Sequence, residues 1–209
     1  MLSFKLFEKS YGANTVLKID DIVLLGGIYW LKGENGSGKS TLIKSLAGLL
    51  SFKGEIFFHE ISLKRQGVAY RYKINFADAE PLFPEYLTGQ EMIDLFIKAK
   101  GGATAAADAF ITAMNMQSYL QNPLGTYSTG MLKKLSLSLA FIGNPSWILL
   151  DEPFIALDVV SLQVLQTHIK KLHEEHKINF LFSSHQHAHL EHLAFVQEVR
   201  ILDKTIKIV

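Results

Sequence analysis

The chain has 209 residues, and none of them is cysteine. Without thiols it can form neither a disulfide framework nor a thiolate metal site, which fits a reducing compartment. An excess of one charge is also missing, because 21 basic and 20 acidic residues leave a net charge of +1. This balance gives no electrostatic reason to bind nucleic acid, so we expect no nucleic-acid partner.

Long hydrophobic runs are absent as well. The longest apolar stretch, residues 22–31, has about half the length that a membrane span requires. Charged residues interrupt the first nine positions too often for a signal peptide. No Pro- and Ser-rich linker and no internal repeat divides the chain. We therefore expect a soluble protein with a single domain over residues 1–209, which reaches a membrane only through a partner.

Apolar residues make up 48% of the chain and charged residues 20%, enough to bury a sizeable core. Apolar strands are embedded between helices, a pattern typical of an α/β fold with a mainly parallel sheet. The N-terminal part predicts strands alone and hence an antiparallel β subdomain. The segments that we expect as strands are 2–7, 15–19, 22–31, 54–58, 74–76, 147–150 and 178–182, with a closing hairpin over 198–202 and 205–209.

A helical insert is predicted within about residues 80–142. Thr88 is a suitable N-cap for a helix whose apolar residues recur at three-to-four spacing, and Gly101 and Gly102 end it. An Ala-rich helix follows over 103–114, and a further helix runs from 130 to 142. In this last helix Lys133 and Lys134 form a short basic pair that we expect on an exposed face. Outside the insert, a helix is expected over 159–175.

The sequence G-E-N-G-S-G-K-S-T at 33–41 matches the phosphate-loop pattern G-x-x-x-x-G-K-[ST]. It follows an apolar strand and opens a helix, which is the context that the pattern needs. Glycines let the backbone N–H groups curl around an anion, and the helix N-terminus adds partial positive charge. A lysine in this loop reaches the β- and γ-phosphates, and the hydroxyl after it ligates Mg²⁺. We expect a nucleotide at Gly33, Asn35, Gly36, Ser37, Gly38, Lys39, Ser40 and Thr41.

The second motif is L-L-D-E-P at 149–153, where a buried apolar strand ends in two acids. Ligands of open parallel sheets lie at the carboxyl ends of the strands. Asp151 is suited to hold Mg²⁺ there, and Glu152 is suited to polarise an attacking water. The alternative is an ordinary strand exit with solvated acids, which the upstream phosphate loop disfavours.

These motifs resemble those of the ATP-binding cassette (ABC) ATPases, specifically the nucleotide-binding subunits of ABC transporters. The resemblance covers almost the whole chain. Segment 33–41 is similar to Walker A and 147–152 to Walker B with its catalytic glutamate, while 127–131 stands where the family has its L-S-G-G-Q signature. The letters here, Y-S-T-G-M, resemble the variant of many bacterial exporter-type cassettes. Segment 156–158 is similar to the D-loop, and His185 stands where the family has its switch histidine.

The resemblance implies ATP and Mg²⁺ as cofactors and an ATPase that powers transport. Glu152, His185 and Lys39 would be catalytic. Ser128 and Gly130 would contact the ATP of a second copy in a head-to-tail homodimer, with Asp158 beside them. The resemblance further implies an integral membrane permease subunit as partner, docked near the insert and residues 78–87. The chain would then lie at the cytoplasmic face of the inner membrane.

Two positions of the resemblance remain open. Tyr11 stands where the family has an aromatic residue that stacks on adenine, with a core or turn role as the alternative. The family's glutamine after the strand 74–76 is missing, and we hypothesise that Asp78 or Glu80 replaces it as an outer Mg²⁺ contact. The alternative functions are a non-transport ABC ATPase and an ATP-binding regulatory module with little turnover.

Histidines are frequent in two parts of the chain. His185, His187, His189 and His192 invite a metal-site interpretation, but no cysteine is present, and the resemblance assigns His185 to the nucleotide. We therefore favour no metal site there. A second group on the helix 159–175 and just after it, which includes His168 and His176, lies among charged residues, and we expect it to be solvated.

Overall fold

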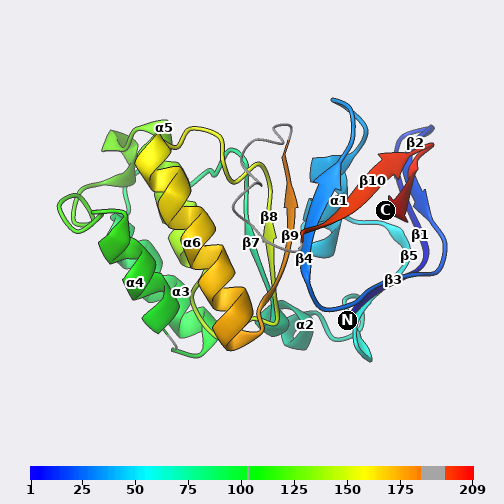
Figure 1. Cartoon of the computed structure of the whole chain (residues 1–209), viewed down its shortest axis with the longest axis horizontal. Coiled ribbons are helices and arrows are strands. Elements are labelled where there is room, and N and C mark those ends of the chain that lie inside the picture. Colours follow the sequence, from blue (N-terminus) through cyan, green and yellow to red (C-terminus); the bar gives the residue numbers. More distant parts are fainter. Residues whose placement is uncertain (103, 185–195) are drawn as a thin grey trace.

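The computed structural model describes residues 1–102, 104–184 and 196–209. A central sheet separates a group of helices on one side from an antiparallel sheet on the other (Figure 1). The helical side holds α3, α4, α5 and α6, and the N-terminal strands form most of the opposite side. The α/β fold with a mainly parallel sheet and an N-terminal antiparallel part is thereby confirmed.

The central sheet has the strand order β11-β10-β4-β9-β8-β7. All neighbours from β10 to β7 pair in parallel, and only the edge strand β11 runs antiparallel to its neighbour. The strands are β4 (Ile28–Lys32), β7 (Ile74–Ala77), β8 (Trp147–Leu150), β9 (Asn179–Ser183), β10 (Val196–Leu202) and β11 (Thr205–Ile208).

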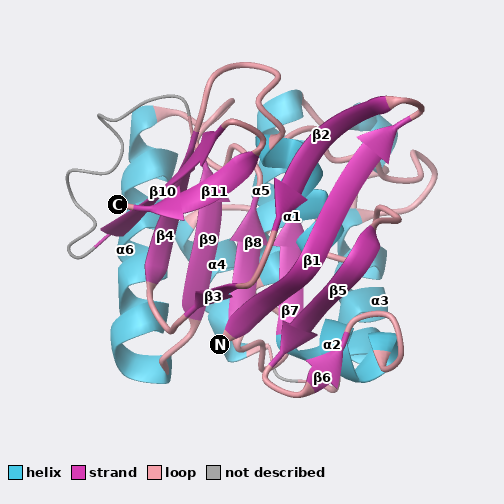
Figure 2. Cartoon of the chain, turned by 90° about the vertical axis from the view of Figure 1, so that its right-hand side faces the viewer, coloured by secondary structure: helices cyan, strands magenta, loops and turns pink. Residues whose placement is uncertain are grey.

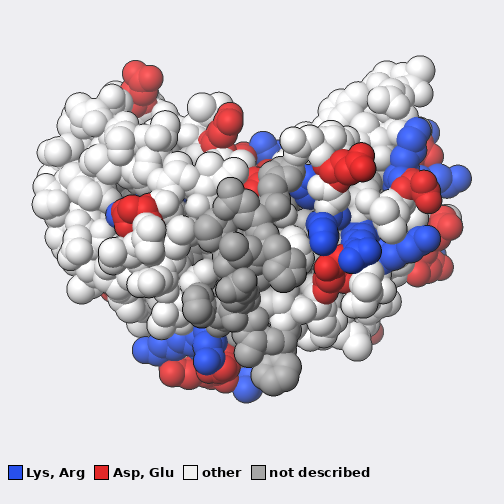
Figure 3. Space-filling model, turned by 45° about the horizontal axis from the view of Figure 1, so that its top comes forward, with Lys and Arg blue, Asp and Glu red and all other residues white. Residues whose placement is uncertain are grey.

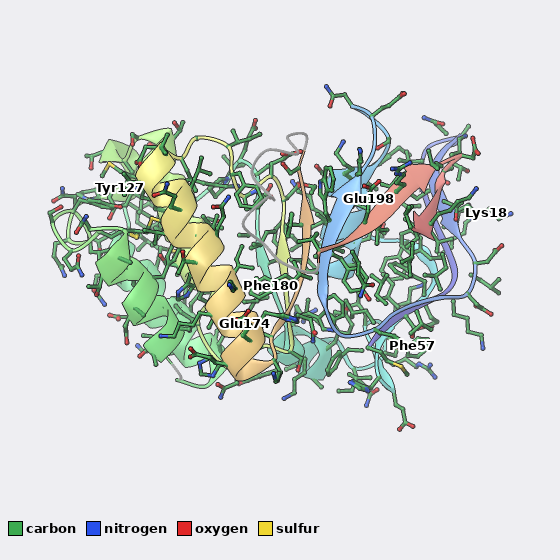
Figure 4. All side chains as sticks on the ribbon, in the orientation of Figure 1. Lys18, Phe57, Tyr127, Glu174, Phe180 and Glu198 are labelled. Carbon is green, nitrogen blue, oxygen red and sulfur yellow. The ribbon has the colours of Figure 1, made fainter. Side chains whose placement is uncertain are left out.

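Both faces of this sheet are buried, which explains the continuous apolar runs of its strands. On β8, Ile148 and Leu150 join the core on the helical side, and Trp147 and Leu149 join the core under the antiparallel sheet. Figure 4 shows the same arrangement for Phe180, whose ring lies between β9 and α6. The strands of this sheet are thus fixed between two packed layers.

The antiparallel sheet crosses in front of the central one (Figure 2). Its strands follow the order β2-β1-β5-β6. The short strand β3 pairs with residues 2–4 at the start of β1, whereas β2 pairs with residues 7–11 at its end. The strands are β1 (Leu2–Tyr11), β2 (Asn14–Ile19), β3 (Ile22–Leu24), β5 (Lys53–Phe58) and β6 (Ile61–Ser62).

The expectation of one strand over 22–31 is wrong. Residues 22–24 form β3 in the antiparallel sheet, whereas 28–32 form β4 in the central sheet. The chain crosses between the sheets at Gly26 and Gly27. A Cβ on Gly26 would lie 3.0 Å from Asn179 Oδ1, and the N–H of Gly27 donates to the same oxygen at 2.7 Å. Two glycines allow this close approach, which apolar character alone does not reveal.

The helices begin where the sequence indicates. Thr88 caps α3 (Gly89–Lys100) in a capping box with Glu91, and Ser128 caps α5 (Thr129–Ala140). These two helices, with α4 (Ala105–Ala113) and the short 3-10 helix η1 (Leu124–Thr126), fall within the range expected for the insert. The remaining helices are α1 (Lys39–Leu46), α6 (Val159–His176), and α2 (Gly67–Lys73), which the sequence did not predict.

The closing hairpin is also present, as β10 and β11. Its two turn residues, Asp203 and Lys204, both have positive φ values of 51° and 64°. Turns of this hand match the twist of the flanking strands, although Asn-Gly is the pair that usually forms them.

Candidate nucleotide site

The phosphate loop connects β4 to α1. Gly36 and Gly38 have φ values of 78° and 104°, in the left-handed region that favours glycine. Gly38 is the N-cap residue of α1, and a Cβ there would lie 3.0 Å from Val16 Cγ1. A Cβ on Gly33 would lie 2.5 Å from Ser37 Oγ. The loop is therefore tightly curled at a helix N-terminus, the arrangement that binds anions.

Lys39 lies inside this loop and is only 6% exposed. Its Nζ donates to the carbonyl oxygens of Gly33, at 2.8 Å, and Glu34, at 2.9 Å. Burial lowers the pKa of Lys39, and the negative charges of Glu152 and Asp151 oppose that shift. The ammonium thus lies in the field of both acids at the place where phosphates would enter.

Asp151 directly follows β8 and is 1% exposed. Its Oδ1 accepts hydrogen bonds from Ser40 Oγ at 3.1 Å and from Ser183 Oγ at 2.7 Å. Its Oδ2 is buried and has no hydrogen-bond partner among the described residues. A free carboxylate oxygen beside a serine hydroxyl is an oxygen-only set of the kind that Mg²⁺ prefers. The residues present therefore fit a magnesium ion at Ser40 and Asp151.

Glu152 follows with a φ of 44°, a conformation that costs energy for a residue with a side chain. It is 8% exposed, and its N–H donates to Ser183 Oγ at 2.9 Å. Ser183 thus contacts both acids, and sequence reasoning missed it. The available signal was its position at the end of β9, which pairs in parallel with β8 and therefore reaches the same edge.

Asp78 lies near this site, but its carboxylate has a partner. Its Oδ2 forms an ion pair with Lys44 Nζ at 2.9 Å, one turn beyond Ser40 on α1. Ser40, Lys44, Asp78 and Glu80 together line a cavity of about 560 Å³ between α1 and the insert. The outer magnesium contact assigned to Asp78 or Glu80 stays a prediction.

Lys133 was expected on an exposed face, and this is wrong, since the residue is 2% exposed. Its Nζ donates to the carbonyl oxygens of Asp78 (2.9 Å), Ala79 (3.3 Å) and Asp151 (3.0 Å). Burial lowers the pKa of Lys133 to about 8, against the opposing effect of the nearby acids. These acceptors follow the ends of β7 and β8, which are far apart in sequence. The burial of Lys133 therefore could not be predicted from the local pattern of residues.

The segment with the signature motif lies at the far end of the helical side, where Figure 4 labels Tyr127. Ser128 Oγ accepts from the N–H of Met131 at 3.2 Å, and a Cβ on Gly130 would lie 3.0 Å from the carbonyl oxygen of Ala156. Ser128, Gly130 and Asp158 line one cavity of about 460 Å³, and no phosphate-loop residue lines it. Within one chain these residues and the phosphate loop are therefore apart.

Asp158 caps α6. Its Oδ1 accepts from the N–H of Ser161 at 2.8 Å and its Oδ2 from Ser161 Oγ at 2.9 Å, and Lys134 Nζ lies 3.5 Å away. The hydrogen bonds from Ser161 lower the pKa of Asp158, with Lys134 contributing less. The sequence did not foresee this capping role, and the nucleotide contact assigned to Asp158 stays a prediction.

Tyr11 ends β1 with 51% of its surface exposed, and Lys9 Nζ lies 4.6 Å from its ring centroid. A core position is thereby excluded, while the adenine contact stays a prediction. Gly33, Gly36 and Ser37 line a cavity of about 910 Å³ with β2 and the β10–β11 turn, but Tyr11 is not among its lining residues.

His185, His187, His189 and His192 lie outside the described residues. In the part of the chain that the structure describes, no three His, Asp or Glu side chains gather as a metal site would require. His185 therefore stays a predicted contact of the nucleotide, without a structural test.

Comparison with known proteins decides the family. The family model described as "ABC transporter" matches residues 22–155. The chain belongs to the ABC transporter family. Among relatives of this ABC protein is the lantibiotic transport ATP-binding protein SrtF of Streptococcus pyogenes, 29% identical over 208 residues. That alignment covers 97% of this chain and 89% of SrtF. The cytochrome c biogenesis ATP-binding export protein CcmA of Legionella pneumophila is 33% identical over 165 residues, covering 77% and 80%.

Solved structures agree with this assignment of the ABC fold. One described as the ATP-binding subunit of an ABC transporter superposes with a TM-score of 0.86 and 26% identity, covering 99% of this chain and 88% of that one. The MJ0796 cassette, a dimer bound to ADP and Pi, has a TM-score of 0.85 over 99% and 97% of the two chains. At 22% identity, this second likeness establishes the fold alone.

Proposed function

We propose that the chain is the ATP-binding and ATP-hydrolysing subunit of an ABC transporter. The observation that carries the proposal is the hydrogen bond of Ser40 Oγ, on the phosphate-loop helix, to Asp151 Oδ1. It brings residues 111 positions apart in sequence to one point, with Glu152 next in the chain. A phosphate loop, a magnesium-binding pair and a base for water are the parts that phosphoryl transfer to water needs.

The residues divide the chemistry between them. Lys39 and the loop N–H groups hold the phosphate oxygens, and Ser40 and Asp151 hold Mg²⁺, which when bound neutralises charge on those oxygens. Glu152 accepts a proton from the attacking water. His185 would hold the γ-phosphate end, and Tyr11 would stack on the base.

We further propose that two copies close head to tail with two ATP molecules between them. Ser128 and Gly130 lie at the N-terminus of α5, which is suited to a γ-phosphate, yet they line a cavity apart from the phosphate loop of their own chain. Beside them Ile155, Val159 and Val160 are 55%, 71% and 68% exposed. Exposed branched aliphatic side chains next to an incomplete site support a second copy as the missing half.

A membrane-spanning subunit is the second partner that we propose. Among the described residues, no helix combines the length and the apolar composition needed to cross a bilayer. Leu82 and Tyr86, between β7 and α3, are 95% and 81% exposed, and Leu82 lines the cavity of Ser40 and Asp78. Figure 3 shows a largely uncharged surface over the helical side, whereas both charge signs mix on the opposite side. We place the permease contact at Leu82 and Tyr86, on the cytoplasmic face of the membrane.

The experiment is a tagged capture from detergent-solubilised membranes of the native host, made with the wild type and with Glu152→Gln. Both forms should recover the same multi-spanning protein. The wild-type complex should hydrolyse Mg²⁺-ATP, and the E152Q complex should be slower by roughly 100-fold or more, because it lacks the base.

Two outcomes would contradict the proposal. Recovery of soluble partners alone would exclude a transport role, and ribosome and DNA binding would then be assayed. Full turnover by E152Q would exclude Glu152 as the base while leaving the transport role intact. Equal recovery by both forms serves as the internal control that the substitution does not disturb folding.

A further inference from the structure

We infer that Lys133 is a positioning residue for Glu152: it holds the peptide group between Asp151 and Glu152 in the orientation that presents the Glu152 carboxylate. The inference rests on the proposed function, because it concerns the base of that reaction. It draws on contacts made by a helix of the insert, outside the nucleotide-binding motifs themselves.

The peptide between the two acids is held at both ends. Its carbonyl oxygen, on Asp151, accepts from Lys133 Nζ at 3.0 Å, and its N–H, on Glu152, donates to Ser183 Oγ at 2.9 Å. Rotation of this peptide would break both hydrogen bonds. That restraint matters because Glu152 has a φ of 44°, which a residue with a side chain keeps only when its surroundings enforce it.

Lys133 also belongs to a closed ring of contacts. It donates to the carbonyl oxygen of Asp78, whose carboxylate pairs with Lys44 on α1. On the other side Asp151 accepts from Ser40, one turn before Lys44 on the same helix. The ring therefore joins the phosphate-loop helix, the exits of β7 and β8, and α5. A closed ring resists displacement of any one member more than separate contacts do.

The side chain type fits this role. Three carbonyl oxygens face one point, and an ammonium offers three donors and no acceptor. Burying such a charge is costly, and an apolar side chain of similar length often packs equally well. Stability alone therefore gives no reason for a lysine here, whereas a fixed peptide orientation does.

The position of Lys133 on α5 has a mechanical consequence. The helix begins at the Ser128 cap, where the proposed second copy presents its ATP, and Lys133 lies little more than one turn further on. A shift of α5 would therefore be transmitted to the Asp151–Glu152 peptide. Engagement of Ser128 would in this way set the geometry of the base in the same chain.

The test replaces Lys133 by methionine, which keeps the length and removes the donors. In the purified full-length chain, kcat for Mg²⁺-ATP should fall about tenfold or more, because small misplacements of a catalytic group are costly, while the dissociation constant for ATP stays within about twofold. The Glu152 amide hydrogen should exchange about tenfold faster, since the peptide is held at one end only.

Lys100→Met is the matched control. Lys100 is also partly buried in a helix of the insert, and its Nζ donates to the carbonyl oxygens of Arg71 on α2 and of Ile74 at the start of β7, at the opposite end of the sheet from the acids. K100M should lower thermal stability as K133M does and leave kcat within about twofold, because it touches no part of the ring.

A wild-type kcat in K133M, an equal loss in K100M, or unchanged exchange of the Glu152 amide would overturn the inference. If K133M does not fold, Lys133→Leu, which also removes the donors, is judged by the same criteria. A wild-type chain that binds ATP without turnover would contradict the proposed function instead, and amide exchange would then decide the role of Lys133 alone.

Discussion

His168 and Lys133 are two side chains on faces that the sequence marks as polar, and the fold buries Lys133 and half-buries His168. His168 on α6 packs against Phe110 at 5.2 Å and Phe141 at 4.6 Å between ring centroids, so the expectation that it is solvated is wrong. Burial lowers the pKa of His168 to about 4, with a smaller effect from Lys171 and an opposing hydrogen bond to the backbone of Ala106.

His168 predicts a loss of stability in acid. In the unfolded chain its pKa is about 6.5, so between pH 6.5 and 4 the unfolded state takes up a proton that the folded state excludes. The free energy of unfolding should therefore decrease as pH falls through this window, by about 2 kcal/mol at pH 4.5 from this residue. Urea unfolding at pH 7 and pH 4.5 measures the effect.

The variant His168→Gln should lose about 2 kcal/mol less than the wild type over that range, because it has no titrating ring. His176→Gln, at the exposed end of α6, is the control and should follow the wild type. Identical pH dependence in H168Q and the wild type would show that the buried ring does not govern acid stability.

At the scale of elements, local signals predicted both ends of a helix, since Thr88 caps α3 and Gly101 ends it. The cap at Thr88 was predictable because an N-cap needs only residues three positions away. The irregular pairing of β1 with β5 could not be predicted from local signals. Their register shifts between Lys5 and Glu8, where Leu6 has a φ of 49°, and Gly54 on β5 lies against this irregularity.

Gly54→Ala should destabilise the antiparallel sheet strongly. Gly54 has a φ of 78°, and an added Cβ would lie 2.1 Å from the carbonyl oxygen of Leu6, which is backbone and cannot rotate away. We expect a loss of more than about 3 kcal/mol in the free energy of unfolding, from strain and displacement of β1 together.

Gly12→Ala separates these two causes. Gly12 lies in the turn between β1 and β2 with a φ of 58°, and a Cβ there would meet no atom within 4 Å. It should cost only about 1 kcal/mol, the strain of the left-handed conformation. Chemical unfolding of both variants gives the comparison, and equal losses would mean that overlap with β1 is not the dominant cost.

The whole molecule presents the residues that we propose to bind nucleotide in two separate places. Phosphate-loop residues line cavities beside β2 and beside α1, and the residues with Ser128 line a third cavity at the end of the helical side. One copy thus offers the two halves of the proposed site in different surroundings. This arrangement is the reason to expect an ATP-dependent dimer.

We expect the Glu152→Gln variant to form this dimer with Mg²⁺-ATP, because it should bind ATP without hydrolysing it. Adding Val160→Asp should keep the chain monomeric while ATP affinity is unchanged, since it places a charge on the exposed aliphatic patch beside Asp158. Light scattering after size exclusion measures the mass.

Val68→Asp is the matched control for this prediction. Val68 on α2 is 68% exposed, the same fraction as Val160, but lies away from the cavity of Ser128. The E152Q/V68D chain should still dimerise. A monomeric E152Q chain, or dimers that tolerate V160D, would contradict the head-to-tail arrangement.

The amino-acid sequence was enough to predict the α/β class, the parallel buried strands, the phosphate loop and the two acids that follow β8. These features depend on neighbours within a few positions: glycines before a helix, apolar runs that end in acids, and caps beside the turns that they stabilise. The family followed from the order of its motifs along the chain.

How these parts contact one another depends on the three-dimensional packing of the chain. The division of 22–31 between two sheets, the contact of Ser183 with both acids and the burial of Lys133 and His168 depend on strand order and on helices packed across the sheet. The hydrogen bond of Ser183 to Asp151 spans 32 positions and that of Ser40 to Asp151 spans 111. Periodicity reports which face of an element is apolar, but not which distant carbonyl or ring lies opposite a given side chain.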